Sequence, residues 1–240
     1  MKAIVLCAGY GTRLGGLTRQ APKAMLPLNG RPLLEYIVCH LLRQGFDEIA
    51  INLHFMPELI RDYFGDGSRF GARLCYFHEP ELLGTAGAVK NMASFVGQDD
   101  LVLIQYGDVL TNQDFTAMLD FHRERQATAT LLVHRRAASN SALEVDEHGC
   151  VVRFLERPTE DQRRTVASPW VFSSVTLGGA ALLEAIPSAI PCDLNRDVFA
   201  RLAGTGRLFA LPLPGERCAV DSPERLEEAR AAAGRGFFRI

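Results

Sequence analysis

Residues 3–14 of this chain read Ala-Ile-Val-Leu-Cys-Ala-Gly-Tyr-Gly-Thr-Arg-Leu, and residues 21–28 read Ala-Pro-Lys-Ala-Met-Leu-Pro-Leu. The apolar run from Ala3 to Leu6 predicts a strand, and Gly9 and Gly11 predict a loop directly after it. Glycines let a backbone approach a ligand closely and turn its N–H groups toward an anion. The stretch therefore predicts a strand followed by an anion-binding loop.

Two basic residues accompany this loop. Arg13 can hold two phosphate oxygens with its forked guanidinium, while Lys23 supplies a compact point charge. Lys23 is one of only three lysines among 26 lysines and arginines, which indicates that its position favours an ammonium group. The glycines and the two cations together are typical of a triphosphate site. The loop is not a Walker A loop, because no Gly-Lys-Ser/Thr follows the glycines.

The glycines alone leave two other interpretations open. They could merely relieve steric strain in a turn between a strand and a helix. They could also begin a Rossmann dinucleotide fold. Against that fold, Leu14 occupies the third glycine position, and a predicted helix stands where a second strand should end in an acidic residue. A nicotinamide-dependent oxidoreductase is therefore disfavoured.

Length and composition narrow the classes of protein. The 240 residues suit one α/β domain, and 48% hydrophobic with 22% charged residues is typical of a globular chain. A formal net charge of −2 disfavours a general nucleic-acid or anionic-membrane binder. The six cysteines show no zinc or Cys-x-x-Cys spacing, and no apolar stretch suits a signal peptide or a membrane span. We expect a cytoplasmic protein with no nucleic-acid and no membrane partner.

Strand-like and helix-like segments alternate through the first half of the chain. This alternation predicts an α/β fold, with βαβ units on a mostly parallel sheet covered on both faces. Two apolar runs about a turn at 146–149 predict a β-hairpin in the second half. The expected strands are residues 3–6, 48–55, 72–77, 101–106, 128–134, 170–177 and 207–213, and the expected helices are residues 32–44, 56–64, 85–95, 114–125, 179–185, 194–203 and 223–233.

Four blocks of the sequence resemble the sugar-1-phosphate nucleotidyltransferases, the enzymes that make nucleotide sugars. The blocks are Gly9-Tyr-Gly-Thr-Arg-Leu14 with Pro22-Lys23, Leu28-Asn-Gly-Arg-Pro-Leu-Leu-Glu-Tyr36, Leu83-Gly-Thr-Ala-Gly-Ala88 and Gly107-Asp108. They stand in the family's order. The resemblance implies a three-layer α/β/α, Rossmann-like nucleotide-diphospho-sugar transferase fold with a small β-hairpin subregion. It also implies one domain over 1–240, with a nucleotide-binding half at about 1–135 and a sugar-phosphate-binding half at about 136–240.

The resemblance also implies which residues contact the nucleotide. Arg13 would meet the β- and γ-phosphates, and Lys23 would meet the reacting phosphates. The Leu83–Ala88 block would recognise the base and ribose through free N–H groups at a helix start, and its form most resembles mannose-1-phosphate guanylyltransferases. A plain helix start capped by Thr85 is the alternative. The expected nucleotide-binding residues are Leu6, Ala8, Gly9, Gly11, Thr12, Arg13, Gly84, Thr85, Gly87 and Gly107.

An aspartate is expected to hold a metal ion. Asp108 follows the apolar strand at 101–106, at the end where parallel sheets present ligand-binding groups. Mg²⁺ on a triphosphate prefers one or two carboxylates, although an aspartate that caps a turn is the plainer interpretation. In the family a second aspartate often completes the metal site, but this chain has Ala219 there and Asp221 two places later. Asp221 either completes the metal site or caps the last helix, as Ser222 also could.

The acceptor half departs from the family. Glu144 matches a glutamate used near the sugar, and Glu156-Arg157-Pro158 matches a Glu-Lys-Pro whose lysine holds the sugar phosphate. The arginine keeps the charge but changes its geometry, and Glu144 could equally be an exposed charge of the hairpin. Ser141 and Phe172-Ser-Ser174 replace the sugar-contacting glycine and Asn-Ala-Gly of the family. The expected sugar-phosphate-binding residues are Glu144, Glu156 and Arg157.

The hypothesis is a Mg²⁺-dependent enzyme that converts an NTP and a sugar 1-phosphate to an NDP-sugar and pyrophosphate. Its expected catalytic residues are Arg13, Lys23 and Asp108. GTP with a mannose- or manno-heptose-type acceptor is favoured, while a cyclitol phosphate, a uridylyl, thymidylyl or adenylyl transfer to another hexose 1-phosphate, and a choline-phosphate cytidylyltransferase stay open. A non-catalytic relative that binds nucleotide sugars is the alternative from another class, and Ala219 supports it. A homo-oligomer stays open, and His54 is given no role.

Overall fold

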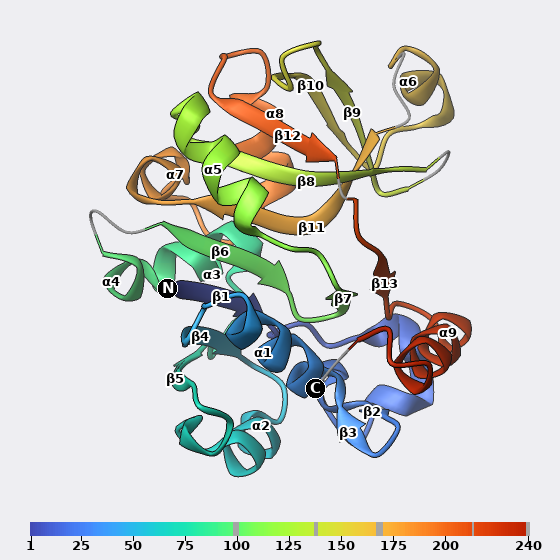
Figure 1. Cartoon of the computed structure of the whole chain (residues 1–240). Helices are drawn as coiled ribbons and strands as arrows, with labels where there is room; N and C mark the ends of the chain where they lie inside the picture. Colours follow the sequence, from blue (N-terminus) through green and yellow to red (C-terminus); the bar gives the residue numbers. More distant parts are fainter. Residues whose placement is uncertain (98–100, 137–138, 167–169, 213, 239–240) are drawn as a thin grey trace. The chain divides into compact units, whose positions relative to one another are not determined.

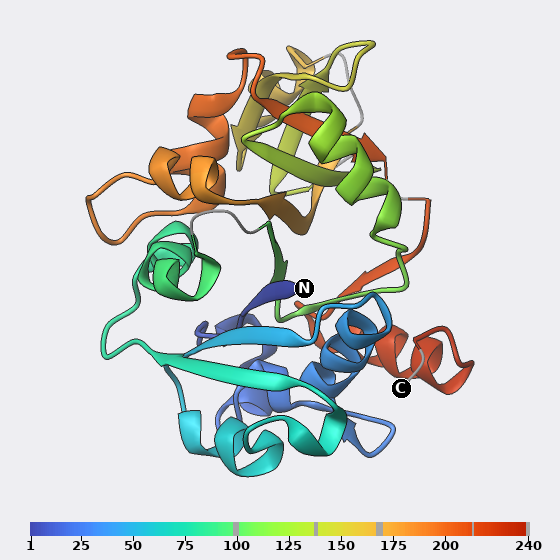
Figure 2. The same ribbon diagram turned by 60° about the vertical axis from the view of Figure 1, so that its left-hand side comes forward.

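The computed structural model describes residues 1–97, 101–136, 139–166, 170–212 and 214–238, apart from the side chains of Thr12 and Arg13. Its elements gather into two compact units that alternate along the chain (Figures 1 and 2). Unit 1 comprises Met1–Leu82, Ile104–Asp114 and Gly215–Ile240, and unit 2 comprises Leu83–Leu103 and Phe115–Pro214. Each unit therefore combines separate stretches of sequence, whereas the predicted halves are continuous. The single-domain interpretation stays a prediction.

The sheet of unit 1 is built from short strands. β1 (Lys2–Leu6), β4 (Glu48–Leu53) and β5 (Arg73–His78) run parallel, and β6 (Val102–Tyr106) lies on the other side of β1. The register pairs Leu6 with Asn52, so the ends of β1 and β4 lie side by side. Isoleucine and valine are frequent in these strands, as expected where both faces of a parallel sheet are covered. The predicted α/β class and its βαβ units are confirmed.

Two helices connect these strands. α1 (Leu33–Arg43) presents apolar residues at helical spacing, and α2 (Pro57–Phe64) begins with a proline, whose missing N–H is not needed at a first helical position. Both helices were predicted from the sequence and are confirmed. The buried apolar residues of α1, none more than 1% exposed, are Leu33, Leu34, Ile37, Val38 and Leu41.

The C-terminal segment completes unit 1. β13 (Arg217–Ala219) pairs antiparallel with β7 (Val109–Thr111), and β2 (Pro27–Leu28) pairs with β3 (Arg31–Pro32). α9 (Pro223–Gly234) packs against β13 and β2. The hydroxyl of Ser222 accepts the N–H of Arg225 at 3.3 Å, so Ser222 caps this helix. Of the two predicted caps, Asp221 is therefore not the one that the helix uses.

Unit 2 contains a mixed sheet in the order β10-β9-β11-β8-β12. β8 (Ala129–Arg135) runs parallel to β12 (Leu208–Pro212), while β11 (Trp170–Gly178) is antiparallel to β8 and to β9. β9 (Ser141–Val145) and β10 (Val151–Glu156) form the predicted hairpin. Its turn holds Gly149 at φ 82°, a conformation that glycine adopts without strain.

Helices pack against this sheet. α5 (Thr116–Arg125) contacts β8, β11 and β12, as Figure 1 shows, and a π-helix at Leu194–Phe199 contacts β10 and continues into α8 (Ala200–Leu202). The other helices are α3 (Gly84–Asn91), α4 (Ala93–Val96), α6 (Glu160–Arg164) and α7 (Ala180–Ala185). None of the helices in the described part of the chain combines the length and apolar character needed to cross a bilayer.

The structure corrects the prediction in a few elements. The single helix expected at 85–95 is broken at Met92 into α3 and α4, and the one expected at 194–203 begins with π-helical turns. The strand expected at 48–55 ends at Leu53. The short helix α6 was not predicted; it begins with a capping box between Thr159 and Gln162. The expected end of the strand at 207–213 lies outside the described residues.

Candidate active site

The first loop and the end of β6 meet at a glycine. The N–H of Gly107 donates to the carbonyl oxygen of Leu6 at 2.9 Å. A Cβ added to Gly107 would lie 2.5 Å from Sγ of Cys7 and 2.9 Å from that carbonyl oxygen, so only glycine allows this approach. Burial, with the nearby charge of Asp108, raises the pKa of the Cys7 thiol. The approach also fixes the position of Asp108, the next residue.

Lys23 and Asp108 form an ion pair. Nζ of Lys23 lies 2.7 Å from Oδ2 of Asp108, and the two side chains are 13% and 28% exposed. Lys23 comes from a short 3-10 helix at Lys23–Met25, while Asp108 follows β6. A charge-assisted hydrogen bond of this length holds both side chains in place. Two of the three predicted catalytic residues are therefore in contact, and the side chain of the third, Arg13, lies outside what the structure describes.

Gly11 shapes the loop around this pair. Its φ of 66° is in the left-handed region, and an added Cβ would lie 3.0 Å from Cγ2 of Thr18 and 3.3 Å from Cβ of Lys23. Glycine at this position therefore lets the loop pack closely against Lys23. Ala8 is buried, whereas a Cβ added to Gly9 would have no neighbouring atom within 4 Å. We call residues 6–11 with Lys23, Gly107 and Asp108 the glycine-loop site.

Asp108 is a suitable ligand for a divalent cation. Its partly exposed carboxylate offers the hard oxygen donors that Mg²⁺ prefers. The carbonyl oxygen of Asp108 accepts the N–H of Val220 at 2.8 Å, so Asp221 follows directly after a residue that contacts Asp108. Oδ1 of Asp221 pairs with Nε of Arg225 at 3.3 Å. Within the described residues no group of three or more His, Cys, Asp and Glu could hold a metal, so a cation here would depend on one or two carboxylates and on substrate oxygens.

The start of α3 uses its backbone N–H groups within unit 2. The N–H of Gly87 donates to the carbonyl oxygen of Cys192 at 3.2 Å, and the N–H of Thr85 donates to Oδ1 of Asp193 at 3.2 Å. Gly84 has φ 76°, and a Cβ there would collide with the same Cys192 carbonyl oxygen. The expectation that the N–H groups of Thr85 and Gly87 are free is thus wrong, because the segment at Cys192 and Asp193 packs onto the helix start. The nucleotide-binding role of these residues stays a prediction.

A second cluster, the acceptor-side group, consists of Glu156, Arg157 and Asn195. Nδ2 of Asn195 donates to Oε2 of Glu156 at 3.0 Å, and Oδ1 of Asn195 is buried with no hydrogen-bond partner in the described part of the chain. Nε of Arg157 lies 3.6 Å from Oε1 of Glu156, and the arginine is 81% exposed. Burial raises the pKa of Glu156, although the Asn195 hydrogen bond and the Arg157 charge oppose this shift. The group combines acceptors for hydroxyls with a cation for a phosphate.

The positions where the sequence departs from the family lie beside a β-bulge of unit 2. The register of β11 against β8 shifts between Phe172 and Thr176, and Ser174 has φ 67°. The N–H of Phe172 donates to Oγ of Ser141 at 2.9 Å, so the replacing serine holds the strand next to the bulge. Glu144 lies in β9 opposite Arg153, and its predicted contact with a sugar stays a prediction.

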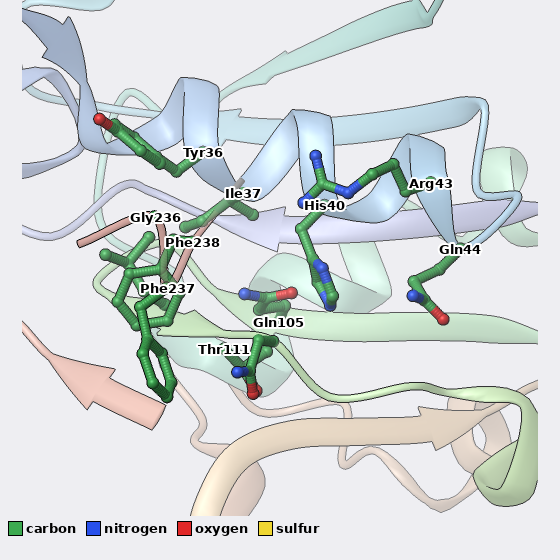
Figure 3. Close-up of a pocket in the computed structure, with 12 residues that line it drawn as sticks. Tyr36, Ile37, His40, Arg43, Gln44, Gln105, Thr111, Gly236, Phe237 and Phe238 are labelled. Carbon is green, nitrogen blue, oxygen red and sulfur yellow. The ribbon is translucent and has the colours of Figure 1, made fainter. Parts of the chain in front are cut away.

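Unit 1 also contains a pocket of about 400 Å³ that none of the predicted site residues lines. Figure 3 shows His40 and Gln105 close together in this pocket, with Phe237 and Phe238 at one end. Gln105 is fully buried, and its Oε1 has no hydrogen-bond partner among the described residues. Burial lowers the pKa of His40 to about 4, so this ring is neutral at pH 7.

Several residues that lie against the predicted ones were not predicted from the sequence. Asp193 directly precedes a predicted helix, which is a typical N-cap position, and this signal could have drawn attention to its segment. Asn52 interrupts an otherwise apolar strand, and a buried polar residue of this kind needs a hydrogen-bond partner. Asn195 carries no signal in the sequence, because its contact with Glu156 joins positions 39 residues apart.

The fold and the glycine-loop site define the class as an α/β protein in which a glycine loop follows the first parallel strand, with a lysine–aspartate pair beside it. A sequence profile described as nucleotidyl transferase matches residues 2–186. The chain belongs to this family.

Curated relatives transfer more than one kind of nucleotidyl group. The chain is 31% identical over 223 residues to a UTP–glucose-1-phosphate uridylyltransferase of Synechocystis, and the matched region covers 87% of the chain and 57% of the relative. It is 34% identical over 209 residues to a mannose-1-phosphate guanylyltransferase of Mycobacterium tuberculosis, covering 85% and 56%. With a D-glycero-α-D-manno-heptose 1-phosphate guanylyltransferase of Campylobacter jejuni, identity is 33% over 162 residues, covering 68% and 71%. The chain thus spans a little over half the length of the first two relatives.

The fold is shared with solved structures. A UDP-glucose pyrophosphorylase crystallised with UDP-glucose superposes with a TM-score of 0.84 at 19% identity, and the match covers 98% of both chains. This likeness supports the nucleotide-diphospho-sugar transferase fold that the sequence predicted.

Proposed function

We propose that this chain is a sugar-1-phosphate nucleotidyltransferase, which transfers the nucleotidyl group of an NTP to a sugar 1-phosphate and releases pyrophosphate. The observation that carries the proposal is the 2.7 Å ion pair between Lys23 and Asp108 next to a glycine loop. Membership of the nucleotidyl transferase family and relatives that act on sugar 1-phosphates support it.

The proposed reaction needs positioning and charge neutralisation but no protein nucleophile. An oxygen of the sugar phosphate attacks the α-phosphorus in line, the bond to the oxygen that bridges the α- and β-phosphates breaks, and pyrophosphate leaves with that electron pair. Asp108 holds the ammonium of Lys23 in one place. The positive charge of Lys23 therefore faces the reacting phosphates without first having to reorganise. Arg13 is the proposed contact of the leaving pyrophosphate.

Asp108 would hold the divalent cation, for which Mg²⁺ is the proposed species and Asp221 the candidate second ligand. When bound, such a cation neutralises the negative charge of the phosphates. The rest of the proposed work belongs to the chain: the backbone from Leu6 to Gly11 surrounds the phosphates, and the acceptor-side group holds the sugar phosphate. In that group, the exposed charge of Arg157 meets the phosphate, while Glu156 accepts a sugar hydroxyl.

GTP with a mannose- or manno-heptose-type 1-phosphate is the favoured pair of substrates. Two guanylyltransferases, 34% and 33% identical to the chain, support this choice. The uridylyltransferase at 31% identity covers a similar share of the chain, and it supports the alternative of UTP with glucose 1-phosphate. Because these identities differ so little, both nucleotides and both acceptors belong in the first experiment.

That experiment measures pyrophosphate release from each common NTP with mannose, manno-heptose and glucose 1-phosphate, with Mg²⁺ and with EDTA. We expect one NTP and one acceptor to dominate, with GTP ahead of UTP, and Asp108→Asn to abolish the signal. If UTP with glucose 1-phosphate gives the highest rate, the favoured substrates are wrong, but the proposed nucleotidyl transfer is supported. Silence in every combination, for a folded protein, would overturn the proposed reaction.

A second candidate is a non-catalytic relative that binds nucleotide sugars. One observation favours it: position 219 is alanine, and Asp221 already pairs with Arg225. For a silent wild-type protein, turnover gained by Ala219→Asp would support this candidate. Turnover in the wild type would exclude it.

A further inference from the structure

Two residues at the end of β4 contact the first loop of the glycine-loop site from the side of the sheet. Asn52 pairs in register with Leu6, and His54 follows two positions later. Asn52 is 4% exposed and His54 is partly buried. Both contact Glu79, which follows β5 and is 1% exposed. The three residues therefore connect the neighbouring strand ends to the loop within unit 1.

The side-chain amide of Asn52 is used at both ends. Its Oδ1 accepts the backbone N–H of Cys7 at 2.6 Å, and its Nδ2 donates to Oε1 of Glu79 at 2.8 Å. A backbone N–H can only donate, so the oxygen of the Asn52 amide faces Cys7 and its NH₂ group faces Glu79. Asn52 thus links the buried side chain of Glu79 to the backbone of the first loop by two hydrogen bonds.

The imidazole of His54 is likewise used at both nitrogens. Nδ1 lies 2.7 Å from the carbonyl oxygen of Glu79, and Nε2 lies 2.6 Å from the hydroxyl oxygen of Tyr10. A carbonyl oxygen only accepts, so Nδ1 carries the hydrogen, and in the neutral ring Nε2 accepts the Tyr10 hydroxyl. Tyr10 is 48% exposed, yet its ring meets the imidazole edge-on with centroids 5.0 Å apart. Asn52 and His54, which both contact Glu79, therefore hold the two ends of the loop at Cys7 and at Tyr10.

We infer that Asn52, His54 and Glu79 are positioning residues that hold the first loop in its nucleotide-binding shape. The inference rests on the proposed function. A loop with Gly9 and Gly11 has unusual backbone freedom, and a flexible loop loses that freedom on binding. Hydrogen bonds to Cys7 and Tyr10 restrict the loop beforehand. Loss of these bonds should therefore weaken NTP binding, whereas binding of the acceptor should be affected much less.

Exchange of the hydrogen-bonding partners tests this role. Asn52→Asp keeps an acceptor for the Cys7 N–H but places two carboxylates against each other, and like charges at this distance repel. The double variant Asn52→Asp/Glu79→Gln restores the hydrogen bond with its direction reversed, because the new amide donates to the new carboxylate. We expect Asn52→Asp to raise the Kd and KM for GTP or UTP about tenfold and the double variant to recover most of that loss.

Tyr10 and a matched tyrosine provide a second test. Tyr10→Phe removes the hydroxyl that donates to His54, and we expect the KM for the NTP to rise about threefold. Tyr76→Phe is the control, because it removes a hydroxyl that donates to the Gly65 carbonyl at 2.8 Å, outside the loop. For Tyr10→Phe the KM for the sugar 1-phosphate should rise much less than the KM for the NTP. For Tyr76→Phe both KM values and kcat should stay near the wild-type values.

The measurements are calorimetric titrations with GTP and UTP, steady-state kinetics for both substrates, and thermal unfolding. The positioning role is overturned if Asn52→Asp binds the NTP as the wild type does, or if the double variant recovers nothing. A purely structural role would lower the unfolding temperature and raise both KM values together, which also overturns it. A wild-type protein that binds neither nucleotide would overturn the proposed function itself, and this inference with it.

Discussion

The glycine-loop site and the acceptor-side group differ in how their charges are balanced. In the former, Lys23 and Asp108 face each other at 2.7 Å, and each charge has a partner of opposite sign. In the latter, Glu156 is paired with a neutral amide and with an arginine 3.6 Å away that is mostly in solvent. A balanced, partly buried pair keeps its geometry, whereas an exposed cation moves with the solvent. We therefore expect changes in the glycine-loop site to affect turnover and changes in the acceptor-side group to affect acceptor affinity.

Removal of either member of the Lys23–Asp108 pair gives the largest expected effect. Lys23→Ala and Asp108→Asn should each lower kcat on the order of 10²–10³-fold. The first removes the positive charge that faces the reacting phosphates, and the second removes the carboxylate that holds this ammonium and would hold the divalent cation. Steady-state kinetics measure the effect, and thermal unfolding shows whether the variant is folded. Near-normal turnover in a folded variant of either kind would remove the difference in function between the two clusters.

A methyl group at Gly107 tests the close approach behind the ion pair. Gly107→Ala should lower the free energy of unfolding by about 1–3 kcal/mol, because the new Cβ meets Cys7 and the Leu6 carbonyl oxygen. Chemical denaturation measures this change. Gly9→Ala is the matched control, since its Cβ would meet no atom within 4 Å. Equal stability of the two variants would mean that the approach at Gly107 is not required.

Arg157→Ala is expected to affect the acceptor alone. The KM for the sugar 1-phosphate should rise about tenfold, as expected for the loss of one charged contact, while the KM for the NTP stays unchanged. Arg164→Ala is the control, because this exposed arginine of α6 forms ion pairs with Glu160 and Asp161 of its own helix. A similar rise in both KM values for Arg157→Ala would contradict a role in binding the acceptor alone.

The smallest expected effect is in the pH dependence of stability. Burial raises the pKa of Glu156 above its usual value of 4.5, so the folded protein holds this proton more tightly than the unfolded chain does. The resulting stabilisation is present below pH 4.5 and is lost as the pH rises through the raised pKa. Glu156→Gln should remove this part of the dependence. Parallel profiles for wild type and variant, from denaturation at several pH values, would contradict the shift.

Local sequence predicted the glycine-loop site because its signals are local. Glycines next to an apolar strand, and an aspartate after another strand, indicate close backbone approach and a strand-end ligand without knowledge of distant contacts. The start of α3 looked similar, but its N–H groups are taken by the segment at Cys192 and Asp193, far along the chain. The helices predicted at 85–95 and 194–203 were also partly wrong. Helical spacing in the sequence did not indicate the break at Met92 or the π-helical turns that begin at Leu194, because tertiary context can override local propensity.

The alternation of the two units has a consequence for synthesis on the ribosome. Residues 1–82 of unit 1 are translated before any part of unit 2, but unit 1 also needs residues 215–240, whereas every segment of unit 2 has been translated by residue 214. β7 gains its partner β13, and Asp108 gains the N–H of Val220, only after residues 215–240 leave the exit tunnel. Translation at about 5–20 residues per second then sets a delay of a second or more between the two units. Of the two units, the one whose translation starts earlier is thus the one in which Asp108, the proposed catalytic aspartate, is fixed later.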